Sequence, residues 1–379
     1  MLLAGKQHRA AGSSMKRIVV GMSGGVDSSV AAALLLEQGY DVIGATMLVW
    51  SPPGVEMEHA ESCCGLSAAE DARRVCQCLG IRHYVLDFRD EFYDRIVRNY
   101  VDEYLQGHTP NPCVRCNEFI KFRALLDRAR ALGAEAVATG HYARIQHDPE
   151  HNRRRLLTGS DPRKDQSYAL YRLSQEQLSH TLFPLGDWQK DAVRRRAREL
   201  DLPTAGKPDS QETCFVPGND YPTLLRILAP EALAPGEFRD PEGRTLGRHA
   251  GIAHYTIGQR KRINVGSPVP LYVSTIRPAD QLVTIAPADH PSLFRSEARA
   301  HEVNFVGLDP AHLPEGPMAV NAKIRYNAAG QPARLSVESH DGSFVLRVQF
   351  DEPVRAVTPG QSLVCYRGEE VLAGGVLVG

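Results

Sequence analysis

Residues 16–29 read KRIVVGMSGGVDSS, a β-branched apolar run that leads into a glycine-rich turn and then into SSVAAALLLEQG (28–39). The apolar run predicts a buried strand, and the alanine- and leucine-rich segment predicts a helix that stops at Gly39. Two consecutive glycines allow a tight turn whose backbone N–H groups point at an anion, and the helix N-terminus adds its dipole. The stretch therefore predicts a strand–loop–helix unit with a phosphate-binding loop at 23–29.

The order of strand followed by helix continues along the chain. Further strands are predicted at 41–47, 82–88 and 134–140, with helices at 68–80, 90–106 and 117–132. Such alternation predicts an α/β fold, a doubly wound parallel sheet with helices on both faces. Ligands bind beyond the carboxyl ends of parallel strands, so we expect the site at the loops after Met22, Met47 and Thr139.

The pattern changes after about residue 220, where short apolar alternations stand between Pro and Gly turns. Short strands at near-even spacing predict small antiparallel barrels. The expected domains are an N-terminal extension (1–14), a phosphate-loop catalytic domain (15–220), a small central β-rich domain (221–290) and a C-terminal antiparallel β-barrel (291–379).

Composition excludes several classes of protein. Hydrophobic residues make up 42% of the 379 residues and charged residues 23%, which is close to the globular norm. No apolar run approaches the roughly 20 residues of a membrane-spanning helix, so no membrane contact is expected. Eight cysteines are too few for a secreted disulfide scaffold, and residues 1–14 lack the apolar core of a signal peptide. We expect a cytoplasmic protein with reduced thiols.

The charges nearly balance over the whole chain but are unevenly placed. Lys and Arg total 44 against 45 for Asp and Glu, a formal net charge of −1, which excludes a globally basic nucleic-acid binder. Basic residues gather at 144–164, in KDAVRRRAR (190–198) and in RKR (260–262). Such runs are usually solvated helix faces, but local patches can also supply phosphate contacts.

The phosphate loop lacks the lysine of the Walker motif, and the dinucleotide pattern G-x-G-x-x-G is also absent. A loop without that lysine suits a departing pyrophosphate better than a polarised terminal phosphate. SGGVDSS resembles the PP-loop of ATP pyrophosphatases, which adenylate a substrate oxygen and release pyrophosphate. The resemblance implies ATP contacts from Gly21, Met22, Ser23, Gly24, Gly25, Val26, Asp27, Ser28, Met47 and Gly140. Asp27 is also a candidate catalytic residue and Mg²⁺ partner, because a departing pyrophosphate needs its charge neutralised.

Two cysteine segments narrow the choice of family. These are TPNPCVRCN (109–117) and KPDSQETCF (207–215), and they accompany ATGHYAR (138–144), KDQSY (164–168), TIGQRK (256–261), KIRY (323–326) and AVTPGQS (356–362). From Met15 onward the chain resembles the tRNA-specific 2-thiouridylases. The resemblance implies an ATP-dependent tRNA-uridine 2-sulfurtransferase that places sulfur on the wobble uridine. Cys214 would carry the persulfide and Cys116 would be the partner nucleophile, with a reductant needed after each turnover.

The chemistry explains why a cysteine would stand where Cys116 does. The segment EFIKFRALLDRA that follows it predicts a helix, so Cys116 is expected just before a helix start. There the helix dipole, with Arg115 and Lys121 nearby, would lower the thiol pKa and favour the nucleophilic thiolate. Cys76 and Cys365 lie in apolar runs and are expected to be core residues.

Contacts with tRNA also follow from the resemblance. Pro110 and Pro112 make a rigid loop suited to a flipped-out base. The implied tRNA-binding residues are Asn111, Pro112, Cys113, His141, Lys164, Asp165, Gln166, Arg325, Tyr326 and Gln361. The expected partners are the Lys, Glu and Gln isoacceptors of tRNA and a sulfur-carrier or cysteine desulfurase donor, with the enzyme acting as a monomer. The central-domain loop departs from the family sequence GQRKGLG, because Arg262 replaces its glycine.

Several alternatives stay open. Another PP-loop enzyme (a 4-thiouridine synthase, a 2-thiocytidine synthase or an amidotransferase-like adenylating enzyme) would share the phosphate loop, and a non-catalytic tRNA-binding protein could retain it. A second sulfur route is also open, because many family members carry aspartate where this chain has Cys113. Cys113, Cys116 and Cys214 could hold three irons of a [4Fe–4S] cluster, leaving the fourth iron to bind hydrosulfide. Otherwise Cys113 simply replaces aspartate, and the persulfide route operates.

Overall fold

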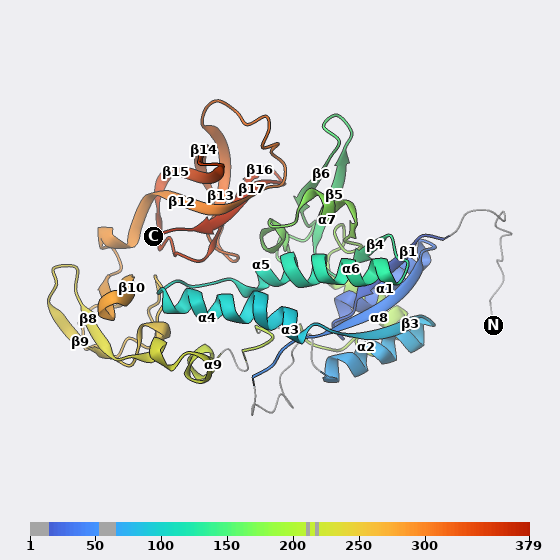
Figure 1. The fold of residues 1–379 in the computed structure, drawn as a ribbon, viewed down its shortest axis with the longest axis horizontal. Coiled ribbons are helices and arrows are strands. Elements are labelled where there is room, and N and C mark those ends of the chain that lie inside the picture. The colour runs from blue at the N-terminus through green and yellow to red at the C-terminus, as the bar shows by residue number, and fades with distance from the viewer. Residues whose placement is uncertain (1–14, 53–65, 210–212, 217–219) are drawn as a thin grey trace.

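The computed structural model describes residues 15–52, 66–209, 213–216 and 220–379 (Figure 1). Its first part is a five-stranded parallel sheet in the order β3-β2-β1-β4-β7. The strands are β1 (Arg17–Gly21), β2 (Asp41–Leu48), β3 (Arg82–Asp87), β4 (Ala136–Ala138) and β7 (Thr181–Leu182). The predicted α/β class is confirmed.

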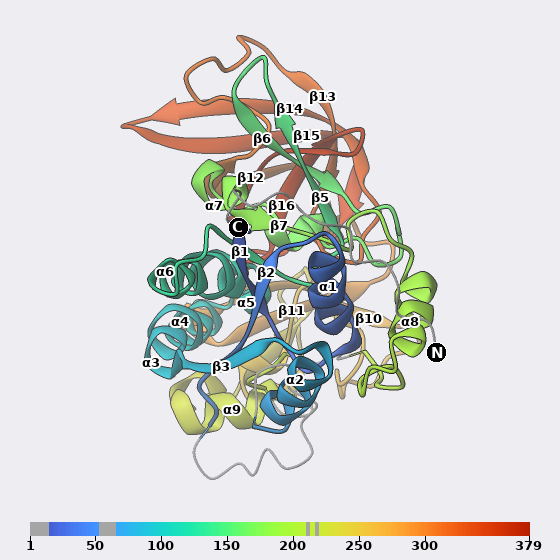
Figure 2. The same ribbon diagram turned by 90° about the vertical axis from the view of Figure 1, so that its right-hand side faces the viewer.

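Alternate side chains of β1 enter different cores, because neighbouring residues of a strand point to opposite faces of the sheet. Ile18 and Val20 pack in one hydrophobic core and Val19 in the other. The first core is covered by α1 (Val26–Glu37), α2 (Leu66–Leu79) and α8 (Lys190–Glu199). The second is covered by helical runs at 89–105 and 112–131, so the sheet lies between two helical layers (Figure 2).

Both of these runs contain π-helical turns. The first joins α3 (Arg89–Phe92), η2 (Tyr93–Val97) and α4 (Arg98–Leu105), and the second joins α5 (Pro112–Cys116), η3 (Asn117–Ala124) and α6 (Leu125–Ala131).

The start of the second run corrects the sequence analysis. The helix begins at Pro112 and not after Cys116. Asn111 caps it, with its Oδ1 accepting a hydrogen bond from the N–H of Val114 at 3.4 Å, and proline is favoured in the first turn because its missing N–H is not needed there. Cys116 therefore lies one turn inside the helix, and Cys113 occupies the first turn. The prediction that Cys116 stands just before a helix start, where the helix dipole acts, was therefore wrong.

A hairpin that the sequence analysis missed links the first part of the chain to the C-terminal barrel. It consists of β5 (Ala143–Asp148) and β6 (Arg153–Thr158), and Leu157 of β6 pairs with Glu370 of the barrel. Arg155 forms a bidentate pair with Glu370 at 2.8 and 2.7 Å. The basic residues of this segment therefore include one that docks the hairpin onto the barrel.

The C-terminal part is the predicted antiparallel barrel. Its six strands run in the order β12-β15-β14-β13-β16-β17, and β12 pairs with β17 to close the ring. They are β12 (Phe294–Phe305), β13 (Met318–Lys323), β14 (Gln331–His340), β15 (Ser343–Arg355), β16 (Ser362–Arg367) and β17 (Glu370–Leu377). In Figure 1 the barrel lies over α4 and α5.

A smaller four-stranded sheet lies between the first part and the barrel in the order of the chain. Its strand order is β10-β11-β8-β9, with one parallel pair, β8 and β11. Its strands are β8 (Gly236–Arg239), β9 (Thr245–His249), β10 (Leu271–Arg277) and β11 (Leu282–Pro287), preceded by α9 (Tyr221–Leu228). The remaining short helices are η4 (Ser167–Leu170), α7 (Gln175–Ser179), η6 (Pro230–Leu233), η7 (Ile252–His254), η8 (Pro278–Asp280) and η9 (Pro291–Leu293). Across the described residues, every helix is too short or too polar to traverse a lipid bilayer.

The loop in which arginine replaces the family glycine keeps a glycine-like backbone, since Arg262 has φ +65°. A left-handed conformation costs an L-residue other than glycine about 1 kcal/mol. We expect Arg262→Gly to raise the free energy of unfolding by up to about that amount, less the extra chain entropy of glycine in the unfolded state. Urea unfolding measures the change, with Arg260→Gly as the control, because Arg260 has no positive φ. A lower stability for Arg262→Gly than for Arg260→Gly would contradict the assignment of strain.

Candidate active site

A pocket opens at the carboxyl ends of β1, β2 and β4, where the sequence analysis expected it. Its empty volume, open solvent included, is about 630 Å³. Its lining residues are Gly21, Ser23, Asp27, Ser28, Met47, Lys121, Thr139, Gly140, His141 and Gln166. Six of the ten residues proposed for ATP line this pocket. Met22 and Val26 instead bury their side chains in the core beside β1 and α1, so only their backbones are available to a ligand.

The phosphate loop is fixed by its own serines. The N–H of Ser23 donates to Ser28 Oγ at 3.2 Å, and the hydroxyl of Ser29 donates to the carbonyl of Gly25 at 2.8 Å. Gly24 has φ +65°, and a Cβ there would lie 2.5 Å from the carbonyl oxygen of Ala68. Gly140 packs as tightly, because a Cβ would lie 2.7 Å from the backbone of Asp27. The loop is therefore held in shape before any ligand binds.

A lysine that the sequence analysis did not single out binds Asp27. Lys190, at the first turn of α8, places its Nζ 2.8 and 2.7 Å from the two carboxylate oxygens of Asp27. The Lys190 side chain is 7% exposed, and the hydroxyl of Tyr142 donates to the same carboxylate at 2.7 Å. Burial, and then the charge of Asp27, raise the pKa of Tyr142 above its usual value, so that hydroxyl keeps its proton. Lys190 therefore places a cation beside the phosphate loop, although the loop sequence itself contains no lysine.

Lys190 also joins the phosphate loop to the segment that leads to Cys214. Its Nζ lies 2.8 Å from Asp209 Oδ1, while Lys164 and Arg194 each bind Asp209 at 2.7 Å. Burial alone would raise the pKa of Asp209, but these cations hold it at about 2. The sequence signal for Lys190 was its place in the basic run KDAVRRRAR (190–198), which does not show that its side chain reaches Asp27.

The cysteines differ in their environments. Cys76 and Cys365 are buried core residues, as predicted, and burial raises the pKa of each thiol to about 12. Cys116 is 9% exposed within the core cluster below α5, Cys214 packs against that cluster while half-buried, and Cys113 is exposed. Within the described ranges, no three His, Cys, Asp or Glu side chains group closely enough to hold a metal ion. Cys113, Cys116 and Cys214 therefore do not form a cluster site in this conformation.

Two residues proposed for tRNA contact, Tyr326 and Gln361, reach from the C-terminal part to the first part of the chain. Tyr326 donates to the carbonyl of Asp165 at 3.2 Å, and Gln361 Nε2 donates to the carbonyl of Thr109 at 2.7 Å. His141 is 9% exposed, and its Nδ1 lies 2.6 Å from Thr139 Oγ1.

The other proposed tRNA residues hold the protein together. Lys164 binds Asp209, and the side chain of Gln166 accepts from the N–H of Tyr142 at 3.0 Å. Asp165 accepts from the N–H groups of Gly159 and Ser167. Arg325 donates to the carbonyl of Arg355 at 3.1 Å.

Comparison with known proteins agrees with this architecture. Three family profiles match in order along the chain: "tRNA methyl transferase HUP domain" over residues 16–218, "tRNA methyl transferase PRC-barrel domain" over 223–287 and "Aminomethyltransferase beta-barrel domain" over 295–377. The fold and the site thus define a nucleotide-binding HUP-domain protein followed by two β domains.

Curated relatives identify the family within that class. The chain is 50% identical to "tRNA-specific 2-thiouridylase MnmA 1" of Thermoanaerobacter pseudethanolicus, over 95% of this chain and 97% of the relative. It is 46% identical to the MnmA thiouridylase of Clostridium perfringens and 47% identical to that of Clostridioides difficile, each over 96% of this chain and 98% of the relative. The chain belongs to the family of tRNA-specific 2-thiouridylases.

Proposed function

We propose that this protein catalyses ATP-dependent 2-thiolation of the wobble-position uridine in tRNA. The observation that carries the proposal is the identity of 46–50% over at least 95% of the chain with relatives named for that activity. The pocket at the phosphate loop and the paired cysteine segments supply the chemistry. The 4-thiouridine and 2-thiocytidine synthases, and a non-catalytic tRNA-binding protein, are not favoured.

The first step activates the base. Uridine O2 attacks the α-phosphorus of ATP, and pyrophosphate leaves, which turns a poor leaving group into an adenylate. The N–H groups of the 23–29 turn, at the N-terminus of α1, would hold the pyrophosphate. The Asp27 carboxylate lines the pocket and has the oxygen donors that Mg²⁺ prefers, so Asp27 would hold a magnesium ion that neutralises the departing charge. In the structure Lys190 occupies that carboxylate, and a bound magnesium would have to share it.

The second step replaces oxygen with sulfur. The terminal sulfur of a Cys214 persulfide attacks C2 of the adenylated uridine, and AMP leaves with the O2 atom. The Cys116 thiolate then attacks the Cys214 sulfur, so a Cys116–Cys214 disulfide forms and the S–S bond to the base breaks. The electron pair of that bond stays on the base sulfur as the 2-thiouridine forms. Alternatively, Cys116 attacks the persulfide first and releases hydrosulfide, which then attacks C2. Either route consumes an external dithiol or an equivalent two-electron reductant.

The cluster route with Cys113, Cys116 and Cys214 is a separate prediction. When bound, a [4Fe–4S] cluster would supply an open iron site for hydrosulfide. Anaerobic purification with iron and sulfide assays, beside Cys113→Asp, separates the two routes. A colourless enzyme that thiolates fully without iron would eliminate the cluster.

The finer assignments belong to the same proposal. The isoacceptors would be those for Lys, Glu and Gln, and the donor would be a sulfur carrier or a cysteine desulfurase. The tRNA-binding residues would be Asn111, Pro112, Cys113, His141, Lys164, Asp165, Gln166, Arg325, Tyr326 and Gln361. We also propose a cytoplasmic location and a monomeric enzyme.

Pyrophosphate exchange into ATP tests the adenylation step. We expect the purified protein to exchange labelled pyrophosphate into ATP only when unmodified tRNA is present, because the adenylate forms on the tRNA. The matched control is the same tRNA with cytidine at the wobble position. Binding of tRNA without any exchange would favour the non-catalytic alternative, and exchange with the cytidine control would favour a different thiolase.

A further inference from the structure

Glu302 of β12, in the C-terminal barrel, forms an ion pair with Arg115 of the helix that carries Cys116. We propose that Glu302 is a positioning residue for sulfur transfer, holding Arg115 and with it the Cys116 turn against the barrel. This inference rests on the proposed function, since it concerns the step in which Cys116 acts. It assigns the barrel a role in that step beyond any contact with RNA.

The backbone at Glu302 is distorted in a way that sheet pairing does not require. β12 pairs with β17 as far as His301 opposite Val376, and pairing resumes with Asn304 opposite Gly374. One extra residue therefore bulges from β12, and within that bulge Glu302 has φ +47°. Bulges re-aim side chains, and strained backbone of this kind persists where surrounding contacts impose it.

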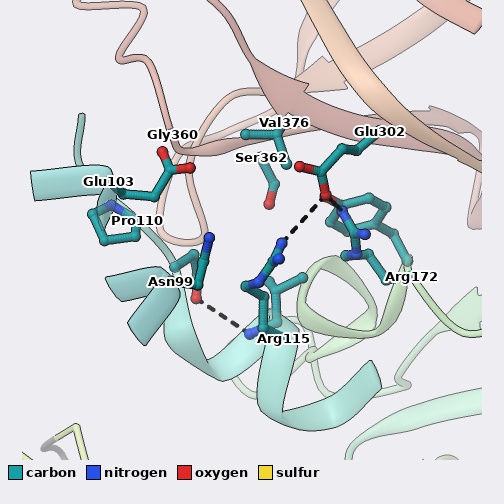
Figure 3. Close-up of a pocket in the computed structure, with 12 residues that line it drawn as sticks. Asn99, Glu103, Pro110, Arg115, Arg172, Glu302, Gly360, Ser362 and Val376 are labelled. Atoms are coloured by element: carbon teal, nitrogen blue, oxygen red, sulfur yellow. Dashed lines mark hydrogen bonds and ion pairs between the residues drawn. The ribbon is translucent and has the colours of Figure 1, made fainter. Parts of the chain in front are cut away.

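The contacts that hold this conformation are ionic. Glu302 Oε2 lies 3.2 Å from Arg115 Nη1 and 3.0 Å from Arg172 Nη1, in a pocket between α4, α5 and the barrel (Figure 3). Arg172 also binds Glu118, so one carboxylate on each side fixes its guanidinium. The Arg115 and Arg172 side chains are 23% and 11% exposed and that of Glu302 is 43% exposed, so solvent screens both pairs in part, from the carboxylate side.

Arg115 transmits this restraint to the nucleophile because it directly precedes Cys116. Its guanidinium lies 5.7 Å from the centroid of the Phe119 ring, which helps to hold the side chain along the helix. The barrel also grips the other end of the same segment, where the N–H of Thr109 donates to the carbonyl of Pro359 at 2.9 Å and Gln361 donates back to the carbonyl of Thr109. Residues 109–116 are thus held at both ends by the barrel.

This arrangement predicts a selective effect. The phosphate pocket contains neither Glu302 nor Arg115, and the Thr109 end of the segment keeps its own contacts with Pro359 and Gln361, so adenylation does not depend on the Glu302 contact. The attack by Cys116 does depend on it, because misplacing a reacting group by about 1 Å can cost on the order of 100-fold in rate. Loss of the Glu302 carboxylate should therefore slow sulfur transfer while sparing the earlier steps.

The test compares Glu302→Gln with Glu297→Gln. Glu297 is a matched control on the same strand, because it also pairs with two arginines, Arg299 and Arg347, whose side chains are 52% and 45% exposed and which lie outside the 109–116 segment. Protein loaded with labelled sulfur at Cys214 is mixed with ATP and tRNA, and transfer is followed in a single turnover. We expect Glu302→Gln to slow transfer by about 10- to 100-fold, with sulfur loading, pyrophosphate exchange and KM for tRNA within about twofold of wild type. We expect Glu297→Gln to match wild type.

Two further measurements distinguish positioning from simple loss of folding. Hydrogen exchange in the 112–118 peptide should accelerate in Glu302→Gln and not in Glu297→Gln, a readout that needs no activity. Glu302→Gly removes the strain as well as the carboxylate, so it should unfold no earlier than Glu302→Gln and yet transfer sulfur as slowly. The inference would be overturned if Glu302→Gln showed wild-type rates of sulfur transfer and of hydrogen exchange. It would also be overturned if Glu302→Gln and Glu297→Gln lost sulfur transfer equally. A wild-type protein that never thiolates tRNA would refute the proposed function instead. The comparison of hydrogen exchange in the 112–118 peptide would still test whether Glu302 holds this helix.

Discussion

Cys214→Ser is expected to accept no sulfur from a donor, and Cys116→Ser is expected to accept sulfur but to form no thiolated tRNA. The physical reason is that the persulfide needs the Cys214 sulfur as its point of attachment, whereas Cys116 acts only when the sulfur is passed on. Cys116 and Cys214 pack against one hydrophobic cluster, which places both segments on the same side of the sheet. Mass spectrometry of the loaded protein, followed by a single turnover with ATP and tRNA, separates the two stages.

Cys365→Ser is the control for this pair, because that thiol is buried in the barrel and its pKa is raised to about 12. It should lose some stability and keep both loading and transfer. Wild-type turnover in either Cys116→Ser or Cys214→Ser would show that its assigned role is wrong. Loading of Cys116 in place of Cys214 would exchange the two roles.

Lys190→Met is expected to abolish adenylation and to destabilise the fold by about 1–3 kcal/mol, because it leaves the partly buried Asp27 carboxylate without its cation, while Asp209 keeps Lys164 and Arg194. Asp27→Ala and Ser23→Ala are expected to abolish adenylation as well. All three should leave affinity for tRNA nearly intact, since most of the proposed RNA contacts (Asn111, Pro112, Cys113, Arg325, Tyr326 and Gln361) lie outside the phosphate pocket. Pyrophosphate exchange, urea unfolding and a filter-binding assay measure the three quantities.

Arg196→Met serves as the control, because Arg196 lies on the same helix and pairs with Glu37 at the surface, where such pairs contribute about 0–1 kcal/mol. It should retain exchange activity and most of its stability. If Lys190→Met lost tRNA affinity as strongly as it lost pyrophosphate exchange activity, the nucleotide site and the RNA surface would not be separate, and the prediction would be wrong.

The parts of the fold that local pattern dictates were predicted well. β1 is apolar on both faces because it lies between two helical layers, and the glycine-rich turn after it places the pocket where parallel strands end. β13 and β15 alternate in sequence because their side chains alternate between a core and solvent, whereas β16 and β17 are buried on both faces because they lie between two cores. The order of strands and helices along the chain and the periodicity of apolar side chains are enough to predict these parts.

Features that depend on distant partners were not predicted. The β5–β6 hairpin is rich in arginine, and it reads as a charged loop until Glu370 is placed beside Arg155. Lys190 opens a basic helix, and only the fold brings it to Asp27. The true helix start was readable from Asn111 and Pro112, a cap and a first-turn proline, but the stronger apolar pattern after Cys116 drew the boundary there instead.

Nucleoside analysis tests the central claim most directly. Unmodified tRNA carrying a wobble uridine is incubated with the purified protein, ATP, Mg²⁺, a reductant and an isotopically labelled sulfur donor, then digested and analysed by mass spectrometry. The account predicts labelled 2-thiouridine at the wobble position, with about one AMP and one pyrophosphate released for each sulfur inserted, as the balanced two-step reaction requires. Sulfur found in 4-thiouridine or 2-thiocytidine, or no label in the tRNA while the protein still binds it, would contradict the account.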